Sequence, residues 1–85
     1  MSATFSMSGS ERSRHLDALD VGARGVVVGV AAGHAERAER LMALGVTRGA
    51  RVRMLQRFPG FVFECDQTEL AVEPAVAREI LVLAD

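Results

Sequence analysis

The chain of 85 residues contains no lysine, no tryptophan and no tyrosine, and its ten cationic side chains are all arginine. The absence of lysine excludes a Schiff-base lysine and the lysine of a phosphate-binding P-loop. The four aromatic residues are all phenylalanine, so the chain lacks the Tyr and Trp side chains that line a groove for proline-rich peptides. A net charge of −1 gives no general attraction to nucleic acid or to an anionic membrane.

Cysteine and long apolar runs are also scarce. A single cysteine, Cys65, cannot form an internal disulfide, which fits a reducing compartment. No stretch reaches the ~20 apolar residues that would span a bilayer. The serine-rich start has no apolar segment of the kind found in secretory signals. These features predict a cytoplasmic protein.

The reactive side chains do not form a catalytic or metal-binding pattern. Cys65 needs a base within hydrogen-bond reach to act as a nucleophile, and the spacing brings neither His15 nor His34 to it. We therefore interpret Cys65 as a small buried strand residue. The sequence has no C-x-x-C and no H-x-x-x-H spacing. We expect no enzyme activity, no bound cofactor and no structural or catalytic metal site. A weak, labile contact with Fe(II) would leave no signature in the sequence and stays open.

Residues 1–15 mix Ser, Gly, Glu and Arg and predict a flexible tail, followed by a single domain over residues 16–85. The domain is expected to be mostly β, a small barrel of five strands with one helix after the first strand. Strands are predicted at 24–31, 51–58, 61–65, 69–73 and 80–83, a helix at 34–44, and a helical turn at 75–78 before the last strand.

Periodicity also predicts which side chains form the core. Alternation along the second strand places Val52, Met54 and Phe58 inward. Its arginines face outward: Arg51, Arg53 and Arg57. In the helix, a common face carries Ala38, Leu41 and Met42. Gly45 is placed to end the helix in a left-handed conformation, and Gly25 and Gly29 to bend the first strand.

Several short motifs follow one another in a fixed order between Leu16 and Val82. They are Leu16-x-x-Leu19-x-x-Gly22, Arg40-Leu41-x-x-Leu44-Gly45-Val46, Arg48-Gly49-Ala50-x-Val52, Leu70-Ala71-Val72 and Ile80-Leu81-Val82. This set resembles the FeoA family, the small cytosolic companions of the bacterial ferrous iron transporter FeoB. The resemblance implies an SH3-like barrel and a non-enzymatic role, in which the chain binds the transporter at its cytoplasmic G domain and supports Fe(II) uptake.

The helix and the turn through Gly49 form the predicted partner surface. Its candidate contacts are Arg37, Arg40, Leu44 and Arg48. Family members usually carry a longer loop after the second strand, and here the link is only Phe58-Pro59-Gly60-Phe61. Self-association is a further alternative that stays open, because Leu55 points outward in the alternation and the last strand is expected to offer a sheet edge.

Two other binding functions remain open at this stage. A similar barrel forms the C-terminal domain of iron-dependent repressors of the DtxR type, so a stand-alone regulatory domain is one alternative. A small RNA-binding barrel is another, because arginines follow one strand face. The net charge and the few aromatic residues disfavour the second alternative, and we expect no nucleic-acid partner.

Overall fold

Short β-branched and aromatic runs form strands wherever the sequence predicts them. The computed structural model describes residues 13–31, 33 and 35–85. Its elements are β1 (Ser13–His15), the 3-10 turn η1 (Leu16–Ala18), β2 (Arg24–Val30), α2 (Ala35–Ala43), β3 (Arg51–Gln56), β4 (Phe61–Cys65), β5 (Thr68–Val72), α3 (Pro74–Ala77) and β6 (Ile80–Ala84). The expected mostly-β architecture, with a helix between strands and a helical turn before the last strand, is confirmed.

The described residues form six strands where five are predicted. The additional strand, β1, takes up residues 13–15, which the sequence analysis assigns to the tail. Ser13-Arg14-His15 carries no apolar pattern, so its extended state comes from antiparallel pairing with β6, where Arg14 lies opposite Val82. The rest of the predicted tail, residues 1–12, lies outside the described residues.

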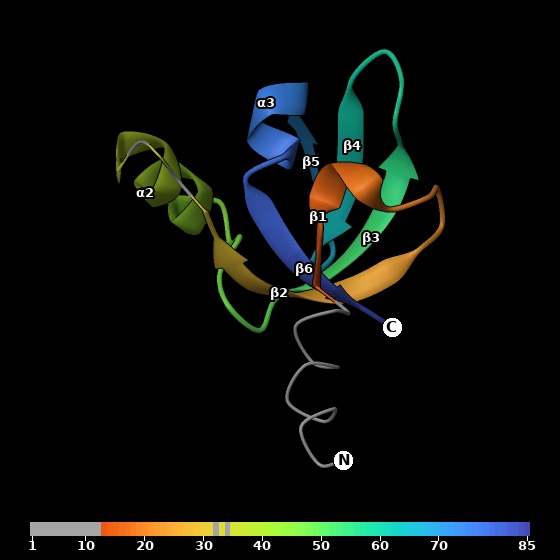
Figure 1. The fold of residues 1–85 in the computed structure, drawn as a ribbon, viewed down its shortest axis with the longest axis horizontal. Coiled ribbons are helices and arrows are strands. Elements are labelled where there is room, and N and C mark those ends of the chain that lie inside the picture. The colour runs from red at the N-terminus through yellow and green to blue at the C-terminus, as the bar shows by residue number, and fades with distance from the viewer. Residues whose placement is uncertain (1–12, 32, 34) are drawn as a thin grey trace, which may run out of the picture.

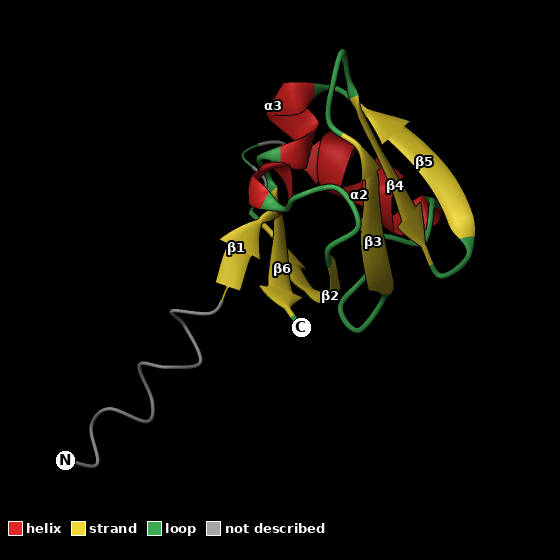
Figure 2. Ribbon diagram, turned by 90° about the vertical axis from the view of Figure 1, so that its right-hand side faces the viewer, coloured by secondary structure: helices red, strands yellow, loops and turns green. Residues whose placement is uncertain are grey.

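The strands pair antiparallel in one sheet with the order β1-β6-β2-β3-β4-β5, which curls strongly around its inner face (Figures 1 and 2). Irregular registers between Val27 and Gly29 in β2, and between Met54 and Gln56 in β3, accompany this bending. The last strand lies between β1 and β2 and is not an edge. The expectation that the chain's final strand offers a free edge is therefore wrong.

The core lies inside the curl. It contains strand residues such as Val27, Met54 and Phe63, all fully buried, and the helical turns η1 and α3 contribute Leu16 and Ala77. In Figure 1 these two turns lie close together over one end of the curled sheet. Burial of apolar area at about 25 cal/mol per Å² is the main stabilising term for so small a domain.

Two residues predicted to be in the core lie on the surface. Phe58 is 85% exposed, because β3 ends at Gln56 and the irregular register before it interrupts the inward–outward alternation. Met42 is 52% exposed, because Leu41 is the buried residue of α2 and Met42 lies about 100° further around the helix. The other core predictions for β3, Val52 and Met54, are confirmed.

Candidate functional site

The C-terminal end of α2 is fixed by a Schellman motif. The Val46 amide donates to the Leu41 carbonyl at 2.9 Å, and the Gly45 amide donates to the Met42 carbonyl at 3.0 Å. Gly45 has a φ of +98°, which confirms the predicted left-handed helix end. Leu41 and Val46 are both buried in the core. The motif therefore anchors this end of the helix through these two side chains and leaves Leu44 between them on the surface.

The other anchor of α2 is an ion pair. Arg37 Nη1 lies 2.8 Å from Glu79 Oε2, and the two side chains are 35% and 20% exposed. Glu79 directly precedes β6, and its carbonyl accepts a hydrogen bond from the Ala31 amide at 2.7 Å. The pair thus ties α2 to the end of β2 and the start of β6.

The turn after α2 packs on β2. The Gly49 amide donates to the Val27 carbonyl and the Val27 amide donates to the Ala50 carbonyl, each at 2.8 Å. Gly49 has a φ of +94°, which a side chain would strain. Arg48 is exposed in this turn. The backbone bonds hold it at a fixed place beside the end of the helix.

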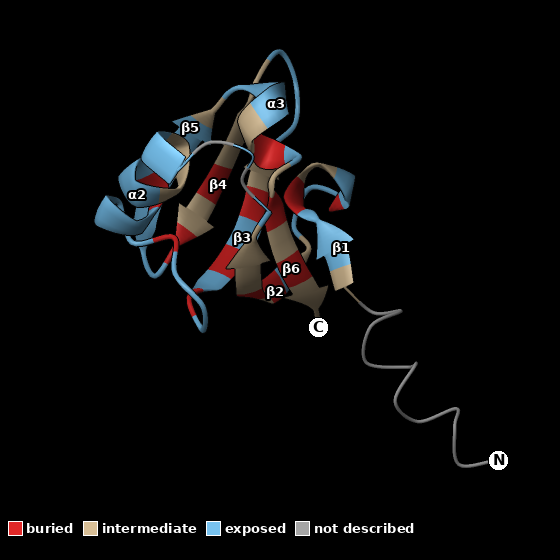
Figure 3. Cartoon of the chain, turned by 60° about the vertical axis from the view of Figure 1, so that its left-hand side comes forward, coloured by how far each residue is buried: buried red, intermediate tan, exposed pale blue. Residues whose placement is uncertain are grey.

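The four predicted contact residues therefore divide into two groups. Arg40, Leu44 and Arg48 are exposed, with Leu44 at 50%. Arg37 is half-buried and engaged with Glu79, so its structural role is to position the helix. Figure 3 shows α2 as a mainly exposed element at the side of the sheet. We define Arg40, Met42, Leu44 and Arg48 as the helix-end surface.

Sequence reasoning missed Met42 and Phe58 as surface residues. An exposed Met next to exposed arginines has the composition of protein interfaces, where both residue types are enriched. Phe58 lies in the short link between β3 and β4, where the Gln56 side-chain amide donates to the Gly60 carbonyl at 3.3 Å. The following Pro59 is the signal that could have ended the predicted strand earlier.

Cys65 is buried, as predicted. Burial raises the pKa of its thiol, and the nearby Asp66 carboxylate raises that pKa further. The thiol Sγ lies 3.5 Å from the Gly45 carbonyl, to which it donates. His15 is on β1, separated from β4 by β6, β2 and β3 in the sheet order, and the predicted His34 lies outside the described residues. A neutral, enclosed thiol is a poor nucleophile.

Two features are absent from the described part of the chain. No group of three or more His, Cys, Asp or Glu side chains there is arranged to hold a metal ion. None of its helices has the length and apolar character required to cross a membrane.

A strongly curled antiparallel sheet with a helix inserted at its side defines a protein of the SH3-like barrel class. A model of the FeoA domain matches residues 14–84. The chain belongs to the FeoA family, a family of small accessory domains linked to ferrous iron transport and not a known enzyme family. Among curated proteins, none matches this chain.

Solved structures support the assignment. FeoA from Chlorobium tepidum is 34% identical, with a TM-score of 0.75 over 84% of this chain and 70% of that one. FeoA from Stenotrophomonas maltophilia, a procaryotic SH3 domain protein solved with zinc, is 29% identical, with a TM-score of 0.71 over 79% of this chain and 86% of that one. A manganese-dependent transcriptional repressor has a TM-score of 0.79 over 86% of this chain and 42% of its own, at 21% identity. The last likeness shows the fold alone.

Proposed function

We propose that this chain is a non-enzymatic cytoplasmic module that binds the cytoplasmic G domain of a FeoB-type ferrous iron transporter. The family match over residues 14–84 carries the proposal. The Stenotrophomonas maltophilia relative has been put forward as a ferrous iron transport activating factor, which is the same kind of role.

We further propose that the helix-end surface makes the contact. It combines two half-exposed apolar side chains, Met42 and Leu44, with the exposed cations Arg40 and Arg48. Interfaces of this kind bury apolar anchors at the centre and place charges around them. The Schellman motif and the docked turn fix the backbone that carries these side chains before binding, which lowers the ordering cost of association.

Arg37 belongs to the predicted contact set, but its substitution alone is a poor test. Replacement of Arg37 by Glu would place two carboxylates together and loosen α2, because Glu79 lies 2.8 Å from the arginine. A loss of binding would then have two causes. Arg40 and Leu44 are better sites for substitution, because the core does not depend on either.

The proposal is tested by measuring the affinity of the full chain for the purified cytoplasmic domain of the cognate transporter. We expect Arg40→Glu combined with Leu44→Asp to weaken binding by at least about tenfold, as substitutions at interface anchors do. Arg14→Glu is the matched control, since Arg14 is an exposed arginine on β1. Equal affinity of the double variant and the control would remove the helix-end surface from the proposal. Absence of binding by the unaltered chain would remove the transporter as the partner.

A further inference from the structure

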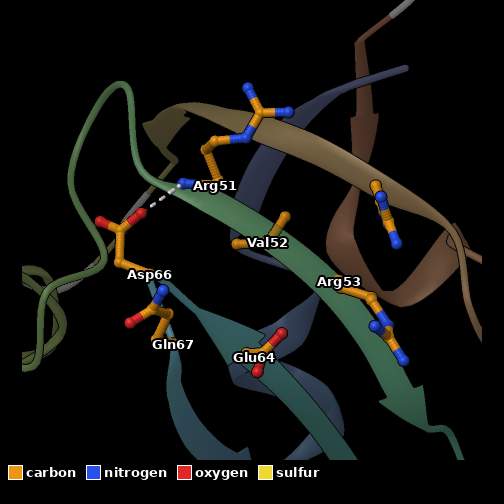
Figure 4. A pocket seen from close by; sticks show the side chains of 7 residues that line it. Arg51, Val52, Arg53, Glu64, Asp66 and Gln67 are labelled. Carbon is orange, nitrogen blue, oxygen red and sulfur yellow. Dashed lines mark hydrogen bonds between the residues drawn. The ribbon is translucent and has the colours of Figure 1, made fainter.

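A pocket of about 360 Å³ lies on the outer face of the sheet. Its lining comes from β2, β3, β4 and the turn between β4 and β5: Arg24, Arg51, Val52, Arg53, Glu64, Asp66 and Gln67. Figure 4 shows Arg53 on β3 and Glu64 on the neighbouring strand, with the turn residues Asp66 and Gln67 on the other side of the view, near Arg51. This volume falls in the range of small-ligand and peptide-side-chain sites. The pocket shares no residue with the helix-end surface.

The strand register places two cations directly opposite each other in this pocket. Arg24 on β2 lies opposite Arg53 on β3. Like charges in directly opposed positions of an antiparallel pair are destabilising. Among the ion pairs formed within the described residues, neither Arg24 nor Arg53 takes part. Within the part of the chain that the structure describes, Arg24 and Arg53 thus lie opposite each other in the register and neither forms an ion pair with a carboxylate.

The acidic residues nearby neutralise the two cations only in part. Asp66 Oδ1 accepts a hydrogen bond from the Arg51 amide at 3.0 Å, so this carboxylate serves the turn backbone. Glu64 lies opposite Arg53 on one side and opposite Glu69 on the other. A row across four strands thus reads Arg24, Arg53, Glu64, Glu69, with its two cations together at one end and its two anions together at the other.

We propose that this pocket binds an acidic peptide segment of a partner protein. A ligand carboxylate pairs with the guanidinium groups of Arg24 and Arg53, whose planar forks suit bidentate bonds to carboxylates. The Glu64 carboxylate and the Gln67 side chain accept hydrogen bonds from backbone N–H groups of the same peptide. The proposal is independent of the transporter contact, because the pocket shares no residue with the helix-end surface.

The mixed charge of the pocket favours a peptide over a nucleic acid. A phosphate backbone repeats its negative charge along the chain and would approach Glu64 and Asp66 as well as the arginines. A peptide carries hydrogen-bond donors and can place one carboxylate at the cationic end of the pocket and N–H groups at the acidic end. The net charge of −1 also gives no general attraction to a polyanion.

The test uses the full chain and a short glutamate-rich peptide with blocked termini, followed by backbone and arginine-side-chain NMR. We expect shifts at the Arg24 and Arg53 Nε–H groups and at the turn residues Asp66 and Gln67. We also expect weaker binding as the salt concentration rises. Arg24→Gln combined with Arg53→Gln should weaken the peptide affinity by about tenfold or more. Arg14→Gln, which removes an exposed arginine from the edge strand β1, a strand that contributes no residue to the pocket, should leave the affinity unchanged.

An oligothymidylate and a glutamine version of the peptide complete the experiment. Tighter binding of the oligothymidylate at the same residues would overturn the peptide assignment, as would equal binding of the glutamine peptide. Absence of shifts in the pocket on addition of the glutamate peptide would overturn the proposal altogether. Because the Arg40→Glu and Leu44→Asp double variant leaves the pocket intact, it should bind the peptide normally even if it no longer binds the transporter domain.

Discussion

Arg37 of α2 and Glu79 at the start of β6 form a part-buried ion pair with a separation of 2.8 Å, although they are 42 residues apart in sequence. The second carboxylate oxygen, Glu79 Oε1, is buried and finds no hydrogen-bond partner among the described residues. Arg37 therefore bonds one of the two carboxylate oxygens and supplies the cation that offsets the charge of Glu79. The pair, together with the buried Leu41, determines how α2 lies against the sheet.

Replacement of Arg37 by Gln should lower the free energy of unfolding by about 1 kcal/mol, because it leaves the carboxylate of Glu79 without its cation. Chemical denaturation measures this change. Glu79→Gln combined with Arg37→Gln should recover part of the loss, since two neutral amides replace the ion pair. A loss of unfolding free energy in the double variant that exceeds the sum of the losses in the two single variants would contradict the pairing.

Gly25 and Gly29 lie on the same strand, but only Gly25 should be sensitive to replacement by alanine. A Cβ atom at Gly25 would lie 2.5 Å from Val82 Cγ1 and 2.6 Å from the Leu83 carbonyl oxygen. The backbone oxygen cannot move aside, so Gly25→Ala should cost about 3 kcal/mol of stability, as overpacking of a core does. A Cβ at Gly29 meets nothing within 4 Å. We expect Gly29→Ala to change the stability by less than about 0.5 kcal/mol. Thermal unfolding measures the change in stability of each variant. Equal losses in the two variants would show that β2 does not approach β6 as described.

The thiol of Cys65 should react slowly with thiol reagents while the protein is folded. Burial raises its pKa above the ordinary value of 9.0, so the folded state favours the neutral thiol. The contribution of the neutral Cys65 thiol to the free energy of unfolding is fully present below pH 9.0. It is lost as the pH rises through the raised pKa of the folded state. The reaction rate with a chromogenic disulfide at neutral pH, measured with and without denaturant, should rise on unfolding. A folded-state rate equal to that of an exposed thiol would refute this placement of Cys65.

Arg24→Gln should raise the stability by about 0.3 kcal/mol, because it removes the like-charge contact with Arg53. The same substitution should weaken binding of the glutamate-rich peptide. Stability and binding would then change in opposite directions, as they do at sites that hold unfavourable charges for a ligand. Arg14→Gln serves again as the control. A decrease in stability on substitution of Arg24 would show that the arginine has a partner within the fold.

Local sequence signals were sufficient for much of this fold. The β-branched run of β2, the inward Val52 and Met54 of β3 and the helix end at Gly45 each follow from a few neighbouring residues, and those predictions were correct. The predicted strands 61–65 and 69–73 also leave a short link after Cys65. Its residues Asp66 and Gln67 take φ values of +48° and +75°, as a tight turn between twisted strands requires.

The features that sequence reasoning missed depend on distant pairing. β1 has no apolar pattern and is a strand because β6 pairs with it. The irregular register in β3 interrupts an alternation that had been extended to Phe58. The Arg37–Glu79 pair and the opposition of Arg24 and Arg53 each join different elements. Residue type alone could not show which arginines form ion pairs within the described residues and which do not.

The most direct test of the proposed role is an amide hydrogen-exchange footprint of the full chain with and without the cytoplasmic domain of its cognate transporter. We predict slower exchange in α2 and in the turn of residues 47–50, with no change in β1. Protection confined to the β3–β4 link around Phe58, or no protection in the complex at the helix-end surface, would contradict the account.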